Sequence, residues 1–281
     1  MKTYLDCIPC FMNQALRTAR FTTDDENIHK QLLDFSAKHL ITIDLNKTPA
    51  ENGEPIYRKI REITGVFDPY KKIKQQSIKE AQKLYPIAKQ IINKSENKLL
   101  TAVKIAITGN IIDFGINNDT NISYDLEKII EQDFGINDFD RFAENVAKAN
   151  KILYIADNAG ESVFDKLLIE QLNTETIYAT RGVPVINDVV IEDAIASGIG
   201  EVAEIISSGS HAPAAILQLC NDKFLDLFYS ADMIISKGQG NYEALSEVDR
   251  SVFFLLKAKC NAIARDLDVK INDIILKAVN V

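Results

Sequence analysis

The chain has 281 residues, of which 46% are hydrophobic and 26% are charged, and its formal net charge at pH 7 is −8. This length allows one large hydrophobic core or two modest ones. The net negative charge argues against a general nucleic-acid binder, which needs a clustered basic surface. No apolar run approaches the roughly 20 residues that span a bilayer, and MKTYLDCIPC lacks a signal-peptide core. We therefore expect a cytoplasmic protein that binds neither nucleic acid nor membrane.

The first half of the chain has the sequence pattern of helices. Apolar residues recur at helical spacing over residues 11–19 and 28–40. Thr48 followed by Pro49 marks the start of another helix, and Gly65 marks its end. These signals predict a helical N-terminal region.

A long lysine-rich stretch follows a further helix start at Asp68, and Pro86 is expected to end or kink this helix. Residues 94–115 then form a largely apolar segment, which we expect to be a helix with Asn110 and Asp113 in its C-terminal part. These two side chains are three residues apart and therefore share one helical face. Without further information, Asp113 is a residue near a helix end with no catalytic duty.

Four cysteines in a chain of this length do not make a disulfide framework. Cys7 and Cys10 form a C-x-x-C pair, which fits half of a zinc site, a redox pair or the start of a helix. A zinc site usually needs four ligands. No second C-x-x-C occurs, although Cys260 is available to join the first pair in space. We favour structural packing at a helix start.

The second half of the chain alternates short apolar runs with helical segments, which is typical of βαβ units and a mainly parallel sheet. A short helix is expected over residues 192–198 and a longer one over residues 212–231. The expected strands lie near residues 151–156, 176–180, 203–207, 231–236 and 251–256. The predicted fold class is α/β, with an N-terminal helical region followed by a mainly parallel, Rossmann-like α/β/α sandwich. We divide it into a mostly helical region, residues 1–150, which contributes part of the active cleft, and an α/β domain, residues 151–281, which carries the metal site.

Polar residues follow the first of these strands at a tight glycine turn. The segment KILYIADNAGE, residues 151–161, places Asp157, Asn158 and Glu161 directly after an apolar run. Open α/β sheets bind ligands beyond the carboxyl ends of their strands. Carboxylate and amide oxygens suit Mg²⁺ or a similar cation. Taken alone, the segment fits a local helix N-cap equally well.

Two further apolar runs end in polar residues. The segment TIYATRGVPVINDV supplies Arg181, Asn187 and Asp188, and ADMIISKGQGNYE supplies Lys237 within a glycine-rich turn. Such a turn at a helix start presents free N–H groups to an anion, and the lysine adds positive charge. Neither a Walker A loop nor a dinucleotide fingerprint is present. The three strand ends together favour a metal-assisted phosphate site.

Five segments resemble, in order, the motifs of the metal-dependent damage-control phosphatases. They are DCIPC at residues 6–10, GNIIDFG at 109–115, DNAGE at 157–161, RGVPVINDV at 181–189 and SKGQGNYE at 236–243. The first is similar to the smaller prokaryotic branch of that family. The resemblance implies hydrolysis of phosphate monoesters of small metabolites, such as sugar phosphates or damaged phosphometabolites, with divalent Mg, Mn, Co or Ni.

The resemblance also implies roles for individual residues. The implied metal ligands are Asp157, Asn158 and Asp188. The catalytic candidates are Asp157, Glu161, Asp113 and Lys237. The substrate-binding candidates are Asn110, Arg181, Gly238, Gly240 and Asn241. Two routes stay open, because either a carboxylate such as Asp113 or Glu161 activates water or an aspartate attacks the phosphorus directly.

Two other functions compete with phosphate ester hydrolysis. A eukaryotic relative has been proposed to be a carboxyl methyltransferase that uses S-adenosylmethionine, but the glycine-rich turn and the strand-end acid that an adenosyl pocket usually needs are missing here. A non-catalytic metal or phosphometabolite-binding module would use the same ligands, and only turnover separates it from an enzyme. The sequence contains no heptad repeat that would indicate an oligomeric state.

Overall fold

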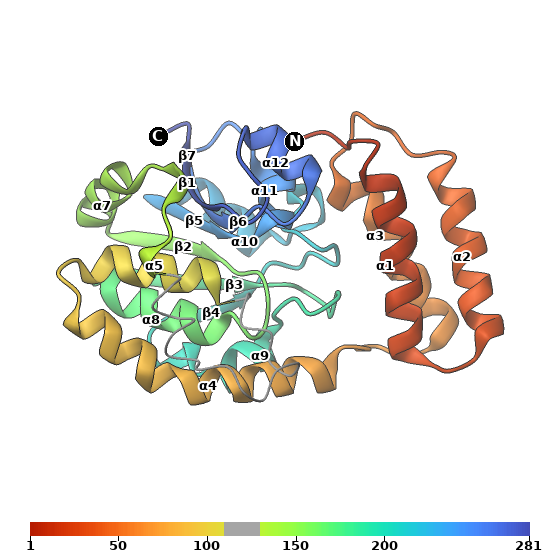
Figure 1. Cartoon of the computed structure of the whole chain (residues 1–281), viewed down its shortest axis with the longest axis horizontal. Coiled ribbons are helices and arrows are strands. Elements are labelled where there is room, and N and C mark those ends of the chain that lie inside the picture. The colour runs from red at the N-terminus through yellow and green to blue at the C-terminus, as the bar shows by residue number, and fades with distance from the viewer. Residues whose placement is uncertain (110–129) are drawn as a thin grey trace.

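A seven-stranded β-sheet forms the centre of the protein, shown here as a computed structural model that describes residues 1–109 and 130–281. The strands are β1 (Phe134–Asn137), β2 (Lys151–Ile155), β3 (Glu175–Thr180), β4 (Glu204–Ser207), β5 (Met233–Lys237), β6 (Val252–Lys257) and β7 (Ile274–Val279). Their order in the sheet is β1-β7-β6-β5-β2-β3-β4 (Figure 1). Every neighbouring pair is parallel except β6 and β7. The predicted mainly parallel sheet is confirmed.

The five strands expected from the sequence are β2 to β6, and each lies within one or two residues of its expected range. The sequence analysis missed β1 and β7. In the short β1, partly buried and exposed residues alternate, and the second half of β7 is only partly buried. Neither strand therefore has the continuous apolar run that marks a buried parallel strand.

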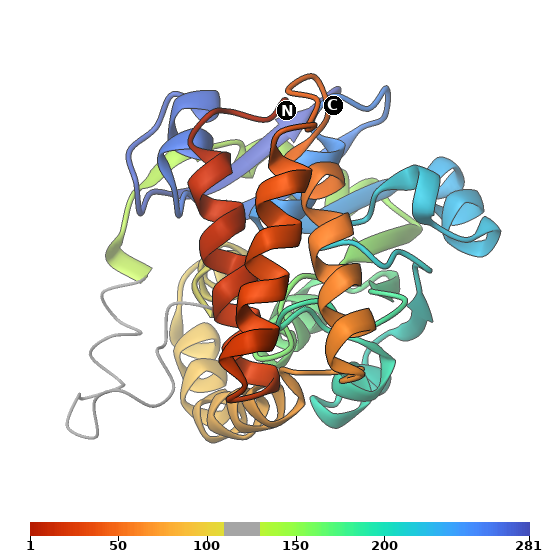
Figure 2. The same ribbon diagram turned by 90° about the vertical axis from the view of Figure 1, so that its right-hand side faces the viewer.

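Three N-terminal helices stand beside the sheet: α1 (Cys7–Thr22), α2 (Glu26–Leu40) and α3 (Pro49–Thr64). The start of α3 is fixed by a capping box, in which the side chains of Thr48 and Glu51 bond each other's backbone N–H groups. Its end is Gly65, whose φ of 68° lies in the left-handed region. Figure 2 shows the three helices in front of one edge of the sheet.

The next helix, α4 (Lys71–Lys94), does not end at Pro86, contrary to expectation. Pro86 is exposed, and buried Leu84 and Ala88 on either side of it pack into the core. Tertiary packing therefore outweighs the cost of the proline. The expected apolar helix is present as α5 (Lys98–Thr108), while Asn110 and Asp113 lie outside the described residues.

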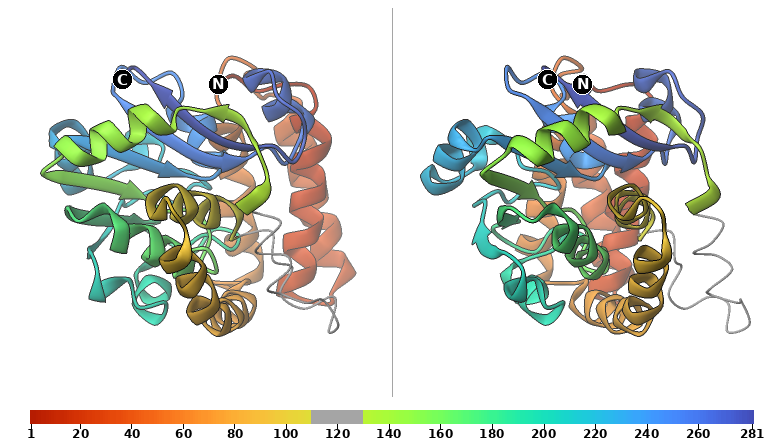
Figure 3. Two further views of the ribbon diagram at one scale, coloured as in Figure 1. Left: turned by 60° about the vertical axis from the view of Figure 1, so that its left-hand side comes forward. Right: turned by 90° about the vertical axis from the view of Figure 1, so that its left-hand side faces the viewer.

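Helices cover both faces of the sheet. Alternate strand residues face opposite cores: Ile152 and Tyr154 belong to one, Leu153 and Ile155 to the other. The first core includes residues of α4, α5, α7 (Phe139–Lys148), α8 (Ser162–Leu172) and α9 (Ile191–Ala196). The second includes residues of α10 (Asp222–Ser230), α11 (Gln239–Leu245) and α12 (Asn261–Leu267), together with α1 and α3. Figure 3 shows the sheet between these layers.

One helix prediction was wrong in length. The expected helix over residues 212–231 is instead a 3₁₀ turn, Leu217–Leu219, followed by α10. The side chain of Asn221 accepts a hydrogen bond from the backbone N–H of Phe224 and so starts α10 afresh. The short helix expected over 192–198 corresponds to α9, with Gly198 just beyond its end.

The arrangement places the carboxyl ends of the central strands opposite α1 and α3 (Figures 1 and 2). The division of the chain near residue 150 stays a prediction, and β1, α5 and α7, which precede that point, pack with the sheet. Among the described residues, no helix is both long enough and apolar enough to cross a membrane.

Candidate metal and phosphate site

Two loops at the carboxyl edge of the sheet are joined by backbone hydrogen bonds, which bring their acidic residues together. The N–H of Val189 donates to the carbonyl of Asp157 at 2.8 Å, and the N–H of Ala159 donates to the carbonyl of Asn187 at 2.9 Å. Asn158 and Asp188 form an isolated antiparallel bridge. The neighbouring strands β2 and β3 thus deliver Asp157, Asn158 and Asp188 to one place.

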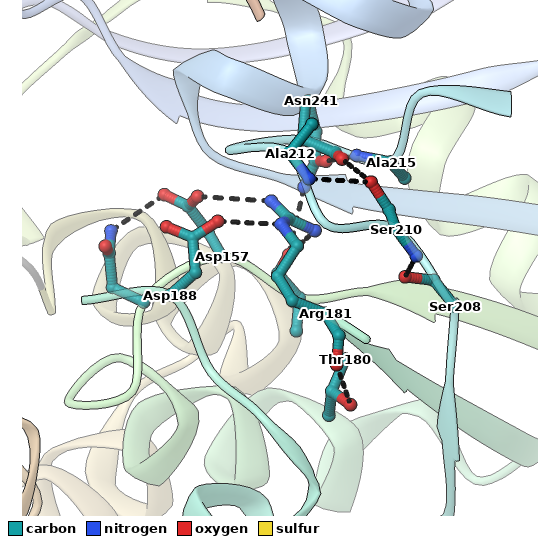
Figure 4. A network of polar contacts seen from close by, with 12 residues as sticks. Asp157, Thr180, Arg181, Asp188, Ser208, Ser210, Ala212, Ala215 and Asn241 are labelled. Carbon is teal, nitrogen blue, oxygen red and sulfur yellow. Dashed lines mark hydrogen bonds and ion pairs between the residues drawn. The ribbon is translucent and has the colours of Figure 1, made fainter. Parts of the chain in front are cut away.

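Arg181 fixes the two carboxylates from behind. Its Nε donates to Asp188 Oδ2 at 2.7 Å, its Nη1 donates to the carbonyl of Ala156 at 3.2 Å, and its Nη2 lies 3.8 Å from Asp157 Oδ1. Figure 4 shows both carboxylates directed toward the guanidinium. Arg181 is 1% exposed, so it positions the acids and does not reach the cleft as a substrate ligand.

The carboxylates are crowded as well as buried. Burial, with Glu161 and Asp188 adding to it, raises the pKa of Asp157 well above its ordinary value. Burial also raises the pKa of Asp188, although the charge of Arg181 opposes this. A bound cation would relieve this accumulation of like charge.

The amide of Asn158 has a fixed orientation. Its Nδ2 donates to Asp157 Oδ2 and to Glu161 Oε1, each at 2.8 Å. With both amide hydrogens used, the Oδ1 atom is available as an oxygen donor on the side of the cleft. Two carboxylates and this oxygen form a donor set that fits a hard divalent cation. Within residues 1–109 and 130–281, no group of three or more His, Cys, Asp or Glu side chains is arranged to hold a metal, so the candidate centre depends on the asparagine.

Lys237 does not face the cleft as the sequence analysis expected. Its Nζ donates to Glu161 Oε2 at 2.9 Å and to Asp165 Oδ1 at 2.7 Å, and the residue is fully buried. Burial opposes the charge of Lys237, but the carboxylates of Asp165 and Glu161 outweigh it and raise the pKa of the amine. Asp165 also accepts hydrogen bonds from the hydroxyls of Tyr154 and Tyr178. The lysine is therefore part of a buried network that supports Glu161 and, through it, Asn158.

The glycine-rich turn after β5 lets the backbone pass close to the acids. Gly238 has a φ of 80°, and a Cβ at this position would lie 2.0 Å from Asp157 Oδ2. A Cβ on Gly240 would lie 2.4 Å from the carbonyl oxygen of Pro213. Both positions therefore need glycine for close packing. Only Gly240 of the two lines the cleft.

Asn241 is likewise a positioning residue. Its Nδ2 donates to the carbonyls of Ala156 at 2.9 Å and Lys237 at 2.8 Å, and its Oδ1 accepts from the N–H of Ala215 at 2.9 Å. The side chain is fully buried and ties three loops together. Its predicted direct contact with phosphate does not fit this position.

A cleft of about 460 Å³ lies between the sheet edge and the helices α1 and α3. Four of the predicted site residues line it: Asp157, Asn158, Asp188 and Gly240. Five others lie behind these: Glu161, Arg181, Lys237, Gly238 and Asn241. The structure thus separates the predicted residues into a layer that reaches ligand and a layer that supports it.

Several residues that line the cleft were not predicted from the sequence, among them Lys259, Gln239 and Glu243. Lys259 is exposed and lines the cleft, and its charge acts to lower the pKa values of Asp157 and Glu161. It follows β6 by two residues, so the rule about strand ends would have found it. Gln239 and Glu243 reach the cleft from α11 and are joined by a 3.1 Å hydrogen bond.

Cys7 and Cys10 begin helix α1, as expected, and both line the cleft. Burial raises the pKa of the Cys7 thiol to about 11, so it is protonated at neutral pH. The favoured assignment to packing at a helix start stays a prediction.

A family model described as the damage-control phosphatase ARMT1-like domain matches residues 3–275. The chain belongs to this family. A damage-control phosphatase of Pyrococcus horikoshii is 37% identical over 276 residues, which cover 96% of this chain and 95% of the relative. A damage-control phosphatase of Archaeoglobus fulgidus is 33% identical over 284 residues, which cover 97% and 98%. The damage-control phosphatase resemblance based on short motifs is thereby confirmed.

Solved structures give the same result for the fold of this damage-control phosphatase family member. The crystal structure of a DUF89 family protein from Pyrococcus horikoshii matches with a TM-score of 0.91 at 36% identity and covers 98% of both chains. The helical N-terminal region and the sheet are therefore both parts of the family fold.

Proposed function

We propose that this chain is a metal-dependent phosphatase that hydrolyses phosphate monoesters of small metabolites. The proposal rests on one observation: Asp157, Asn158 and Asp188 lie together on one wall of a cleft, and the exposed Lys259 lines the same cleft. Oxygen donors for a cation and a free amine for phosphoryl oxygens are the groups that phosphate ester hydrolysis needs. The names of the relatives agree with this function.

Asp157, Asn158 and Asp188 would hold the divalent cation. Such an ion, when bound, supplies Lewis-acid charge that polarises a phosphoryl oxygen. The donor chemistry fits Mg²⁺ and Mn²⁺ well, and Co²⁺ and Ni²⁺ are compatible with the same oxygen set.

The surrounding residues keep the reacting groups in place. Arg181 holds Asp188 in one orientation, and Glu161 holds the amide of Asn158. Lys259 is exposed at the cleft and is able to bind a phosphoryl oxygen and offset its charge. Glu161 does not line the cleft, and its carboxylate is paired with Lys237. Its proposed role is therefore to orient Asn158 and not to take a proton from water directly.

Phosphate release from p-nitrophenyl phosphate and from a panel of sugar phosphates tests this function. The protein is treated with EDTA and then given Mg²⁺, Mn²⁺, Co²⁺ or Ni²⁺. We expect turnover to depend on the added metal and to fall at least about 10³-fold in Asp157→Ala, since metal charge stabilisation contributes several kcal/mol.

The matched control is Asp226→Ala. Asp226 is exposed on α10 and does not line the cleft, so this variant should keep full turnover. Equal activity in Asp157→Ala and Asp226→Ala would remove Asp157 from the site. Silence of the wild type with every metal would leave a binding module or a methyltransferase as the better account.

A further inference from the structure

The wall of the cleft opposite the acidic residues is formed by α1, α3 and the segment before α4. Arg17 lies on this wall, exposed, with its guanidinium 5.8 Å from the centre of the Phe21 ring. Among the described residues, no carboxylate lies within ion-pair distance of it. Arg17 therefore presents an unpaired positive charge to the cleft.

Two tyrosines connect this wall with the acidic end. The Tyr70 hydroxyl is hydrogen-bonded to Thr18 at 3.0 Å, and the Tyr70 ring meets the Phe21 ring edge to face with centres 4.9 Å apart. Tyr57 is 8% exposed and lines the cleft. In the part of the chain that the structure describes, its hydroxyl has no hydrogen-bond partner, which leaves a donor without a partner on a residue that lines the cleft.

Burial and neighbouring groups change the pKa values of both tyrosines. Burial raises the pKa of Tyr70, and the charge of Arg17 opposes this rise. Burial also raises the pKa of Tyr57, with smaller contributions from Tyr70 and Asp188. A Cβ on Gly53 would lie 3.3 Å from the Phe11 ring and 3.6 Å from the Tyr57 ring, so Tyr57 lies close to Phe11, which precedes Arg17 on α1.

Among the described residues that line the cleft, two are cationic, Arg17 on α1 and Lys259 after β6. Arg17 lies seven residues beyond Cys10, about 10 Å farther along α1. Lys259 lies beside Gln239, whose Oε1 accepts a hydrogen bond from the Lys259 backbone N–H at 3.3 Å. A volume of about 460 Å³ is within the range of sites for whole small molecules, so the cleft has room for a ligand that extends from one cation toward the other.

We propose that the substrate is a phosphate monoester with a second anionic group, a carboxylate or a second phosphate, and that Arg17 binds this second group while Tyr57 donates a hydrogen bond to the body between them. This inference rests on the proposed phosphatase function for the identity of the first group. An exposed arginine in the lining of the cleft suits either anion, because its guanidinium makes two parallel hydrogen bonds to carboxylate or phosphate.

Matched substrate pairs test the inference. Glycerol 3-phosphate is compared with 3-phosphoglycerate for a carboxylate, and fructose 6-phosphate with fructose 1,6-bisphosphate for a second phosphate. We expect kcat/KM to be at least about tenfold higher for the doubly anionic member of one pair, because charge-assisted hydrogen bonds are worth about 1.5–3 kcal/mol. The pair that shows the difference identifies the second group.

Arg17→Gln should abolish this preference, whereas Arg20→Gln should keep it. Arg20→Gln is the matched control, because Arg20 is exposed on the same helix but does not line the cleft. A preference that survives in Arg17→Gln, or equal kcat/KM values within both pairs in the wild type, would overturn the inference.

A binding measurement separates this inference from the proposed function. Calorimetric titration with 3-phosphoglycerate and with fructose 1,6-bisphosphate is carried out on wild type, Arg17→Gln and Arg20→Gln. At least about tenfold weaker binding in Arg17→Gln alone, for either ligand, supports the anion site even if no substrate turns over. Equal affinities in all three proteins for both ligands contradict it, whatever the phosphatase assay gives.

Discussion

The two walls of the cleft differ in how their side chains are held. On the sheet side, Arg181, Lys237 and Asn241 are buried, and hydrogen bonds hold each of them to neighbouring loops or acids. On the helical side, Arg17 is exposed and the Tyr57 hydroxyl is unbonded among the described residues. The contrast indicates that the proposed catalytic end is preorganised, whereas the proposed recognition end depends on ligand to complete its contacts.

Removal of the buried lysine is the severest test of the preorganised side. Lys237→Met leaves the carboxylates of Glu161 and Asp165 buried and unpaired. We expect a loss of about 3–5 kcal/mol in the free energy of unfolding, because an uncompensated buried charge is costly. Turnover should fall as well, since Glu161 would no longer hold Asn158 in one orientation. Urea denaturation and the phosphatase assay measure the two effects.

Lys223→Met is the comparison for that variant. Lys223 forms an ion pair with Glu204 at 2.8 Å, but both side chains are more than half exposed, at 62% and 57%. Exposed pairs contribute at most about 1 kcal/mol. Equal losses of stability in the two variants would mean that the Lys237 network is not the rigid support described above.

A methyl group on the glycine turn tests the same side without changing its charge. Gly238→Ala would direct a Cβ toward Asp157 Oδ2, at 2.0 Å, in a backbone with a φ of 80°. We expect the carboxylate to be displaced and kcat/KM to fall about 100-fold, since small misplacements of reacting groups have effects of this size. The strained backbone should also cost about 1–3 kcal/mol of stability.

Gly65→Ala separates the effect of backbone strain from the effect of the contact with Asp157. Gly65 has a φ of 68°, but a Cβ there would have nothing within 4 Å. This variant should lose stability through backbone strain and keep its kcat/KM. A similar loss of activity in both variants would show that contact with Asp157 is not the reason for Gly238.

Sequence reasoning found the strand ends but not the direction of every side chain. Asp157, Asn158 and Asp188 follow apolar runs, and parallel strands bring such positions to one edge. Whether Arg181 and Lys237 face ligand or the interior depends on carboxylates contributed by other elements, and Asp165 on α8 gave no separate signal in the sequence. The resemblance located Lys237 in a motif without showing that its amine points inward.

The same limit applies to the fold. Buried parallel strands such as β2 and β5 have continuous apolar sequences, so their positions were predictable. The strand β1 has only four residues, and its place beside β7 depends on contacts between distant segments. Pro86 does not end α4, because the low helix propensity of proline is outweighed by the core packing of the helix residues on both sides of it.

Glu243, which lines the cleft from α11, provides the smallest and most selective test. Burial raises its pKa to about 7, while a hydrogen bond from Gln239 and the N-terminal amine oppose this, and Asp266 adds to it. The Cys7 and Cys10 thiols face it from α1. At pH values between about 4.5 and 7, the folded protein therefore holds a proton that the unfolded chain has released.

The stabilisation from this group is complete below about pH 4.5 and is lost as the pH rises through 7. Its size is at most about 3 kcal/mol. Glu243→Gln cannot lose a proton, so the stability of this variant relative to wild type should rise between pH 4.5 and pH 8. Denaturant unfolding at a series of pH values measures this difference. If the free energy of unfolding varies with pH in the same way in both proteins, the Glu243 carboxyl is in contact with water. This part of the cleft would then resemble the open helical wall.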